Sequence, residues 1–145
     1  MTSDYCVAVH ALVYLNHKAK VLSSEELAEN ICTNPARVRK VMAKLKRAEL
    51  VKTREGSEGG YLFVKDPAQV TLAQIAEAME VRFVETSWKS GDTDMTCLVA
   101  SGMAALMDEV FDRLNENCLV QLREITIESL DRRIFGNKSK LTAVN

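Results

Sequence analysis

The chain has 145 residues, 47% of them hydrophobic, with a formal net charge of −1 and a pI near 6.1. This length and apolar content suit one compact unit with a single core rather than two separately folding domains. No segment approaches the roughly eighteen consecutive apolar residues of a membrane span, and the first four residues do not begin a secretory signal. We therefore expect a cytoplasmic protein without a membrane partner.

Charge is distributed unevenly along the chain. Residues 1–70 carry eleven cations and eight anions, whereas residues 71–145 carry eight cations and twelve anions. The first half therefore has a net charge of +3 and the second half a net charge of −4. Such an asymmetry predicts a nucleic-acid surface on the first half and a different task for the second.

Two helices are predicted at the beginning of the chain. Residues 4–17 are apolar on most sides, which is typical of a helix buried by several partners. Ser23 with Glu26 three residues later has the pattern of a capping box and opens a second helix. Leu27 and Ile31 of this second helix are expected to face the core.

A strongly basic third helix follows. Asn34 is a favourable N-cap, and Pro35 stands at the first helical position, where proline is preferred. The helical period places an apolar stripe on one side, made of Val38, Val41, Met42 and Leu45. The cations fall on the opposite side and its flank, and they are Arg37, Arg39, Lys40, Lys44, Lys46 and Arg47. The small residues Ala36 and Ala43 lie between them and would let the helix approach base edges closely.

The charges of the basic helix and the strand after it are almost all positive, which distinguishes a nucleic-acid surface from an ordinary solvated helix face. Residues 37–54 contain eight cations and one anion, a net charge of +7. A solvated helix face usually carries both signs, whereas a clustered stripe of one sign is typical of nucleic-acid binding. The stripe also argues against a module that binds only proteins.

A glycine-rich hairpin is predicted next, with strands at 51–54 and 61–64 around Gly56, Gly59 and Gly60. Its glycines do not form a phosphate loop, because the GK[ST] ending is missing, and no other catalytic motif indicates an enzyme. Helix, turn, basic helix and hairpin in this order predict a winged helix-turn-helix, so the fold class is mainly α with a small β wing. The residues expected to contact DNA are Ser24, Asn34, Ala36, Arg37, Arg39, Lys40, Lys44, Arg54, Ser57, Gly59 and Gly60.

The second half is predicted to consist of helices separated by one loop. Thr71 with Gln74 forms another capping box, and Thr126 caps a last short helix. We expect a DNA-binding domain at 1–81, a sensor loop or linker at 82–96, a dimerisation helix with the C-terminal helix at 97–135 and a loose tail at 136–145. The long helix has a coiled-coil-like seam that could pack on a second copy, formed by Met103, Leu106, Met107, Val110, Phe111 and Leu114.

The chain resembles a known family over nearly its whole length. The matching features are the helix at 5–15, Leu27-Ala28, Asn34-Pro35, Val38-Arg39-Lys40-Val41, Leu50-Val51, Gly56-x-x-Gly59-Gly60-Tyr61 and a long helix beginning at Cys97. In these it is similar to the Rrf-two family of bacterial transcription regulators, the IscR, NsrR and CymR group. The resemblance implies a homodimeric repressor or activator on a palindromic double-stranded operator, and we expect a repressor. The family's wing is usually basic before Gly56, where this chain has Glu55, so Arg54 or Ser57 would make that contact.

We expect neither a metal nor another cofactor. Family members with an iron–sulfur cluster supply three closely spaced cysteines near the long helix, whereas this chain has only Cys97 there. Thiolate clusters need about three or four protein ligands, and the four cysteines show no CxxC-type zinc spacing. A dimer that combined two Cys97 thiolates with His10 or an aspartate remains an alternative, as does a small ligand near Trp88.

Thiol chemistry is the preferred signal. Cys6 and Cys118 are interpreted as small buried hydrophobic residues, the commonest state of a free cysteine. Cys32 precedes the basic helix and Cys97 begins the long helix, where nearby cations or the helix dipole favour a thiolate. The resemblance adds that thiol-sensing members join their subunits by a disulfide, here Cys32–Cys97 or Cys97–Cys97 across the dimer. The alternative to thiol sensing is that all four cysteines have only a structural role.

Overall fold

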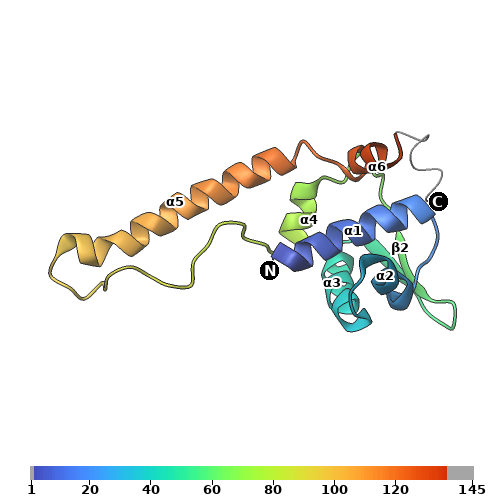
Figure 1. Ribbon diagram of the computed structural model, residues 1–145, viewed down its shortest axis with the longest axis horizontal. Helices are drawn as coiled ribbons and strands as arrows, with labels where there is room; N and C mark the ends of the chain where they lie inside the picture. Colours follow the sequence, from blue (N-terminus) through green and yellow to red (C-terminus); the bar gives the residue numbers. More distant parts are fainter. Residues whose placement is uncertain (1, 137–145) are drawn as a thin grey trace.

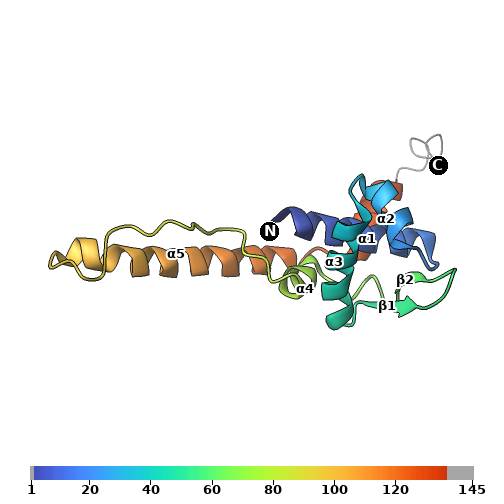
Figure 2. The same ribbon diagram turned by 90° about the horizontal axis from the view of Figure 1, so that it is seen from below.

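The computed structural model describes residues 2–136, which form a body and a projecting arm (Figure 1). The elements in chain order are α1 (Thr2–Lys18), α2 (Ser24–Ile31), α3 (Pro35–Arg47), β1 (Val51–Arg54), β2 (Gly60–Phe63), α4 (Leu72–Ala78), α5 (Leu98–Leu122) and α6 (Ile127–Phe135). The body contains α1 to α4, the two strands and α6. The arm consists of residues 82–97 and α5, which run side by side away from the body in both views (Figures 1 and 2). None of the helices in residues 2–136 is long and apolar enough to cross a membrane.

Local capping fixes where the helices begin, as the sequence predicts. The Ser23 hydroxyl accepts from the Glu26 N–H at 3.1 Å, while the Glu26 carboxylate accepts from the Ser23 N–H at 2.8 Å. Reciprocal pairs of the same kind open α4 at Thr71 and α6 at Thr126. The predicted starts of these helices are confirmed because each cap depends on residues only three positions apart.

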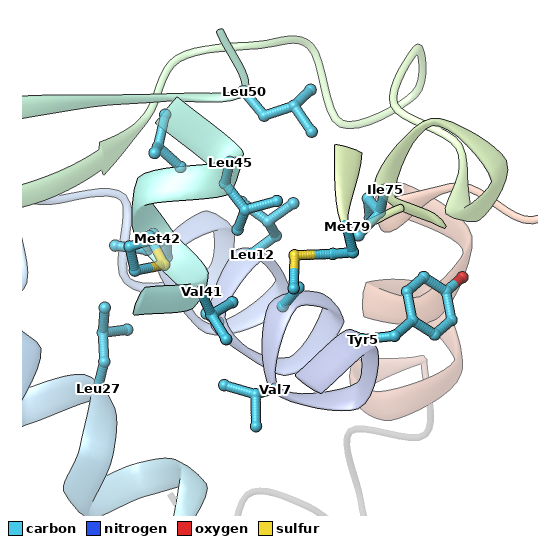
Figure 3. Packing of buried hydrophobic residues seen from close by; sticks show 14 of the residues in the cluster. Tyr5, Val7, Leu12, Leu27, Val41, Met42, Leu45, Leu50, Ile75 and Met79 are labelled. Carbon is cyan, nitrogen blue, oxygen red and sulfur yellow. The ribbon is translucent and has the colours of Figure 1, made fainter. Parts of the chain in front are cut away.

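The core lies in the body, around α1. Its largest fully buried side chains come from α1, α2, α3, β1, α4 and α6 and include Leu12, Leu27, Met42, Leu45 and Ile75 (Figure 3). Helix α1 contacts α2, α3, α4, β2 and α6, so the expectation of a helix buried by several partners is confirmed.

The interpretation of Cys6 as a buried residue is wrong. Its neighbours Tyr5, Val7 and Ala8 are buried, but Cys6 lies on a side of α1 that the core does not cover. The apolar composition of α1 concealed this because both sides of the helix read as hydrophobic. Cys118 is partly buried, as a cysteine on a packed helix would be.

The hairpin is connected to the body through the turn before α2. Strands β1 and β2 pair in antiparallel register with Thr53 opposite Tyr61 and Arg54 opposite Gly60. Leu22 and Tyr61 exchange two backbone hydrogen bonds of 2.8 and 3.0 Å, which bind the wing to this turn. A Cβ atom at Gly60 would lie 2.2 Å from the Leu22 carbonyl oxygen, and its φ of +155° disfavours other residues. Glycine is therefore required where the wing meets the turn.

The arm is held together by polar contacts between its two segments. Asn115 is buried within α5, and its side-chain oxygen accepts from the N–H groups of Phe83 and Val84 at 2.8 and 2.9 Å. The Asn115 amide nitrogen donates to the carbonyl oxygens of Val84 and Phe111. Further along, Arg82 pairs with Asp112, and Lys89 pairs with Asp108. The predicted loop at 82–96 is thus an ordered strap that follows α5.

Candidate nucleic-acid interface

Helix α3 presents its cations on the outside of the body. Its apolar residues Val38, Val41, Met42 and Leu45 are all buried, as the periodicity predicts. Asn34 accepts from the Arg37 N–H at 2.7 Å and caps the helix, while Pro35 occupies the first turn. Ala36 and Ala43 are exposed between the cations, so the backbone of α3 is accessible on this face.

Arg37 is tied to the first helix of the body. Its Nε donates to Asp4 Oδ1 at 2.8 Å, and both side chains are partly buried. Hydrogen bonding and attraction from Arg37 lower the pKa of the Asp4 carboxyl from its ordinary value. This contact could not be predicted from the sequence, because 33 positions separate the two residues.

Arg39 connects α3 to the beginning of α2. Its Nη1 donates to Ser24 Oγ at 3.2 Å and lies 3.6 Å from the Glu25 carboxylate. Ser24 is buried and also donates to Glu25 at 3.1 Å. A direct contact from the Ser24 hydroxyl to DNA would therefore require this small network to rearrange.

The other cations of the stripe form no ion pairs within residues 2–136. Five of them are exposed and Lys44 is partly buried; they are Lys40, Lys44, Lys46, Arg47, Lys52 and Arg54. Unpaired cations grouped on one face attract an anionic backbone and release counterions when they neutralise its phosphates. This part of the surface can bind a polyanion without first breaking internal contacts.

The wing extends from the body beside α3 (Figure 2). Arg54, Ser57 and the two acidic residues Glu55 and Glu58 are exposed on it. Gly59 cannot carry a side chain without a clash, because a Cβ atom there would lie 2.3 Å from the Arg54 carbonyl oxygen. The two glycines predicted at the DNA surface thus have a structural reason to be there.

The comparisons with known proteins agree with this architecture. A family model for Rrf2, described as an iron-dependent transcriptional regulator, matches residues 1–133. The chain belongs to the Rrf2 family of transcriptional regulators. This is the Rrf-two family that the sequence resembles, and its members are regulators rather than enzymes.

Individual relatives of this Rrf2 chain span almost its full length. YwnA of Bacillus subtilis (strain 168), named as an HTH-type transcriptional regulator, is 27% identical over 135 residues, which are 93% of this chain and 99% of YwnA. A crystal structure from Lactobacillus plantarum has a TM-score of 0.80 at 19% identity and covers 99% of this chain and 97% of that one. CymR, the global cysteine regulator of B. subtilis, has a TM-score of 0.65 at 19% identity and covers 92% and 96%. The two structures show that the mainly helical fold with a two-stranded wing is shared.

The iron in the description of the Rrf2 family does not fit the donors of this chain. Within residues 2–136 of one chain, no three His, Cys, Asp or Glu side chains gather where they could hold a metal ion. Cys97 is the only cysteine in the strap and α5 start, and thiolate clusters need about three or four protein ligands.

The two candidate sensor cysteines are both exposed in the Rrf2 chain, but they lie far apart. Cys32 caps the C-terminal end of α2 in a left-handed conformation with φ of +61°, directly before α3. Cys97 is the N-cap residue of α5, at the end of the arm farthest from the body (Figure 1). The backbone N–H groups of Ala100 and Val99 at the start of α5 lower the pKa of the Cys97 thiol. Because Cys32 and Cys97 lie far apart in one subunit, a disulfide between them cannot form within that subunit.

Proposed function

We propose that this Rrf2 regulator is a homodimer that binds palindromic double-stranded operator DNA sequence-specifically and acts as a repressor. We propose further that oxidation of Cys32 and Cys97 controls its operator binding. The cationic face of α3 carries the DNA-binding part of the proposal, because its unpaired cations lie beside a wing in the order of a winged helix-turn-helix.

In this proposal α3 enters the major groove and the wing contacts the backbone beside it. Ala36, Arg37 and Arg39 at the N-terminal end of α3 would read base edges. Phosphate contacts would come from the other residues predicted in the sequence, namely Asn34, Lys40, Lys44, Arg54, Ser57, Gly59, Gly60 and, after rearrangement, Ser24. This division follows the usual docking of a recognition helix, whose first turns meet the bases.

An apolar stripe on α5 supports the homodimer. Leu106, Val110 and Leu114 are all exposed on the arm, in a helix that projects from the body. Monomeric proteins rarely expose a contiguous apolar surface of this kind, which commonly marks a protein interface. Pairing two arms would cover the stripe and set two α3 helices on successive major grooves, about 34–36 Å apart.

A salt titration with a determination of oligomeric state tests the DNA-binding dimer. If half of the eight cations of each subunit contact phosphate, the logarithm of the binding constant should fall against the logarithm of salt concentration with a slope of about −7. A slope near zero, or a monomer at micromolar concentration in sedimentation, contradicts the proposal.

The redox part rests on the positions of the two thiols. Cys32 lies directly before α3, and Cys97 is the N-cap of α5. A disulfide between Cys32 of one subunit and Cys97 of the other would therefore shift the two α3 helices relative to the dimer axis. Disulfide formation removes two protons and two electrons from the thiols, and an oxidant such as diamide accepts both. The Cα atoms must come within about 4.4–6.8 Å.

Mild oxidation on a non-reducing gel tests this bond. We expect a reducible dimer band that is absent in Cys32→Ser and in Cys97→Ser, together with a change in operator affinity. Full cross-linking in Cys32→Ser assigns the bond to two Cys97 residues instead. If neither variant alters the response to the oxidant, both cysteines are structural and redox control fails.

A further inference from the structure

We propose that Glu25 is a positioning residue for DNA recognition, which holds the Arg39 guanidinium so that its free edge reads a guanine in each operator half-site. The proposal rests on the DNA-binding function proposed above, in which Arg39 reads base edges. It deepens that function by naming the base that Arg39 selects. It also gives a role to an anion that lies among the cations of the DNA-binding surface.

Glu25 is the second residue of α2 and lies beside α3. Its Oε1 is 3.6 Å from Arg39 Nη1, and its Oε2 accepts from the Ser24 hydroxyl at 3.1 Å. The same hydroxyl accepts from Arg39 Nη1 at 3.2 Å. The Glu25 side chain is 70% exposed, but its own backbone N–H, the Ser24 hydroxyl and Arg39 lower the pKa of its carboxyl. Glu25 is therefore an anion at neutral pH that faces Arg39.

These contacts occupy one end of the Arg39 guanidinium and leave its other edge free. Arginine carries five N–H groups in a planar fork, and both partners of Arg39 lie at Nη1. Within residues 2–136, neither Nε nor Nη2 of Arg39 forms a hydrogen bond or an ion pair. Two donors side by side match the O6 and N7 acceptors of guanine in the major groove. Adenine carries a donor at N6 in place of O6, so this edge of Arg39 discriminates against it.

The wing borders this network and restricts it further. Tyr61 in β2 exchanges backbone hydrogen bonds with Leu22, two positions before Ser24. The Tyr61 side chain lies near both charges, because burial raises the pKa of its hydroxyl while Arg39 lowers it and Glu25 raises it. A guanidinium held between α2 and the wing loses less conformational freedom on binding DNA than an unpaired lysine side chain does. Arg39 is thus oriented before DNA arrives.

An anion on this surface favours selectivity at the expense of general affinity. The Glu25 carboxylate repels phosphates and so weakens binding to every DNA sequence. If the Ser24 hydroxyl turns toward a phosphate when DNA binds, as proposed above, Glu25 remains as the partner of Arg39. Binding is then favourable chiefly where the free edge of Arg39 meets guanine, which is how a repulsive group can increase specificity.

Glu25→Gln tests the proposal on a duplex selected from a randomised DNA library with the wild-type protein. Each guanine of the duplex is replaced in turn by adenine and by 7-deazaguanine, which lacks the N7 acceptor. In wild type, one guanine in each half-site should lose roughly 5- to 150-fold in affinity on replacement by adenine, the range of a bidentate contact. Arg39→Ala should be insensitive to this replacement. Glu25→Gln should reduce the loss several-fold while binding random DNA at least as tightly as wild type.

Glu29→Gln is the matched control for this measurement. Glu29 is exposed one turn further along α2 and forms no ion pair with the rest of the described chain. This variant loses the same charge but should keep the full preference for guanine. Thermal unfolding of both variants checks that α2 remains formed. An unchanged guanine preference in Glu25→Gln overturns the positioning proposal, whereas a wild-type protein without preference for any sequence overturns the proposed function itself.

Glu25→Asp separates the contact from the charge. Aspartate keeps the negative charge at the start of α2, but its carboxylate is one methylene shorter and cannot reach Arg39 in the same geometry. We expect the guanine preference to fall as in Glu25→Gln, whereas binding to random DNA stays close to that of wild type. Full guanine preference in Glu25→Asp would overturn the proposal, because the charge alone would then be sufficient.

Combining Glu25→Gln with Arg39→Ala distinguishes a positioning residue from one that reads a base itself. A carboxylate can accept a hydrogen bond from cytosine N4 and so recognise a base directly. In that case Glu25→Gln would change the base preference even when Arg39 is absent. A residue that acts through Arg39 should have no effect on base preference in the Arg39→Ala background. A changed preference in that background therefore overturns the proposal.

Discussion

Arg37 on α3 donates to Asp4 on α1 at 2.8 Å, so one of the cations expected to read DNA is neutralised in the free protein. The pair ties the first turn of α3 to the first turn of α1. A base contact through Arg37 Nε must replace this bond, whereas a contact through its terminal nitrogens keeps the Asp4 carboxylate close to the DNA. In either case operator affinity includes the free energy of accommodating Asp4.

Asp4→Asn should strengthen operator binding. Removing the carboxylate leaves Arg37 free and takes one anion away from the DNA-facing surface, which we expect to be worth about 0.2–1 kcal/mol, the range of a partly exposed ion pair. Fluorescence anisotropy with operator DNA at fixed salt measures the effect. Asp66→Asn, an exposed aspartate beyond the wing, is the control. Weaker operator binding by Asp4→Asn, at unchanged stability, would contradict this prediction and would mean that the Asp4–Arg37 pair only positions Arg37.

The same pair gives a pH dependence of stability. The pKa of Asp4 is lowered in the folded protein, so its contribution is complete above the ordinary carboxyl pKa of 3.8 and is lost as the pH falls through the lowered value. Wild type should therefore be more stable than Asp4→Asn near neutral pH, and this difference should shrink below about pH 4. Urea unfolding at several pH values measures it, and a constant difference would contradict the assignment.

Base readout is expected at the N-terminal end of α3 and phosphate contact at its C-terminal end. Arg37→Ala or Arg39→Ala should lose about 1–3 kcal/mol on the operator and narrow the preference over random DNA. Lys46→Ala and Arg47→Ala should weaken both DNAs alike. Because Arg39 also connects to Ser24, thermal unfolding of each variant must accompany the binding data. Equal losses on both DNAs from all four variants would remove the assignment.

Asn115 should control the order of the strap. Asn115→Leu removes the acceptor for two N–H groups and the donor for the Val84 carbonyl oxygen, and each buried polar group left unpaired costs about 1–3 kcal/mol. We expect a lower free energy of unfolding and faster hydrogen exchange at Phe83 and Val84. Asn117→Leu, two positions away on the exposed side of α5, should leave both quantities nearly unchanged. Unaltered exchange in Asn115→Leu would show that the ion pairs alone hold the strap.

Cys97 should be a more reactive thiol than Cys118. Its pKa is lowered by two backbone N–H groups at the start of α5, so a larger fraction is thiolate at neutral pH, and Cys118 is partly buried. Iodoacetamide labelling followed by mass spectrometry should give a pH midpoint for Cys97 below the ordinary thiol value. Val99→Pro removes one of these two N–H groups and should move the pH midpoint of Cys97 labelling upward. A midpoint that does not move would exclude the helix start as the cause.

The elements were predictable from sequence where a few neighbouring residues decide them. Capping pairs such as Ser23 with Glu26, and the buried stripe of α3, depend on spacings of three or four residues, so the boundaries followed directly. The wing strands were placed within one residue, since Gly60 rather than Tyr61 begins β2.

Contacts between distant residues were not predictable in this way. Nothing near Arg37 indicates Asp4, and the apolar composition of α1 hides the exposure of Cys6. The burial of Asn115 was not predicted either, because its partners in the strap depend on how the arm folds back. The site residues were found through charge, whereas their internal partners depend on tertiary structure.

The Leu22–Tyr61 backbone hydrogen bonds join the wing to the turn before α2, and the Asp4–Arg37 pair joins α1 to α3. The DNA-binding elements α1, α2, α3 and the wing therefore form one block in each subunit. In the proposed dimer, the length of α5 sets the distance between two such blocks. One inserted residue would turn the block beyond it by about 100° and advance it by about 1.5 Å. Seven inserted residues would restore its orientation to within about 20° while lengthening the helix by about 10 Å. If the proposed dimer forms, the preferred distance between operator half-sites therefore depends on the number of turns in α5.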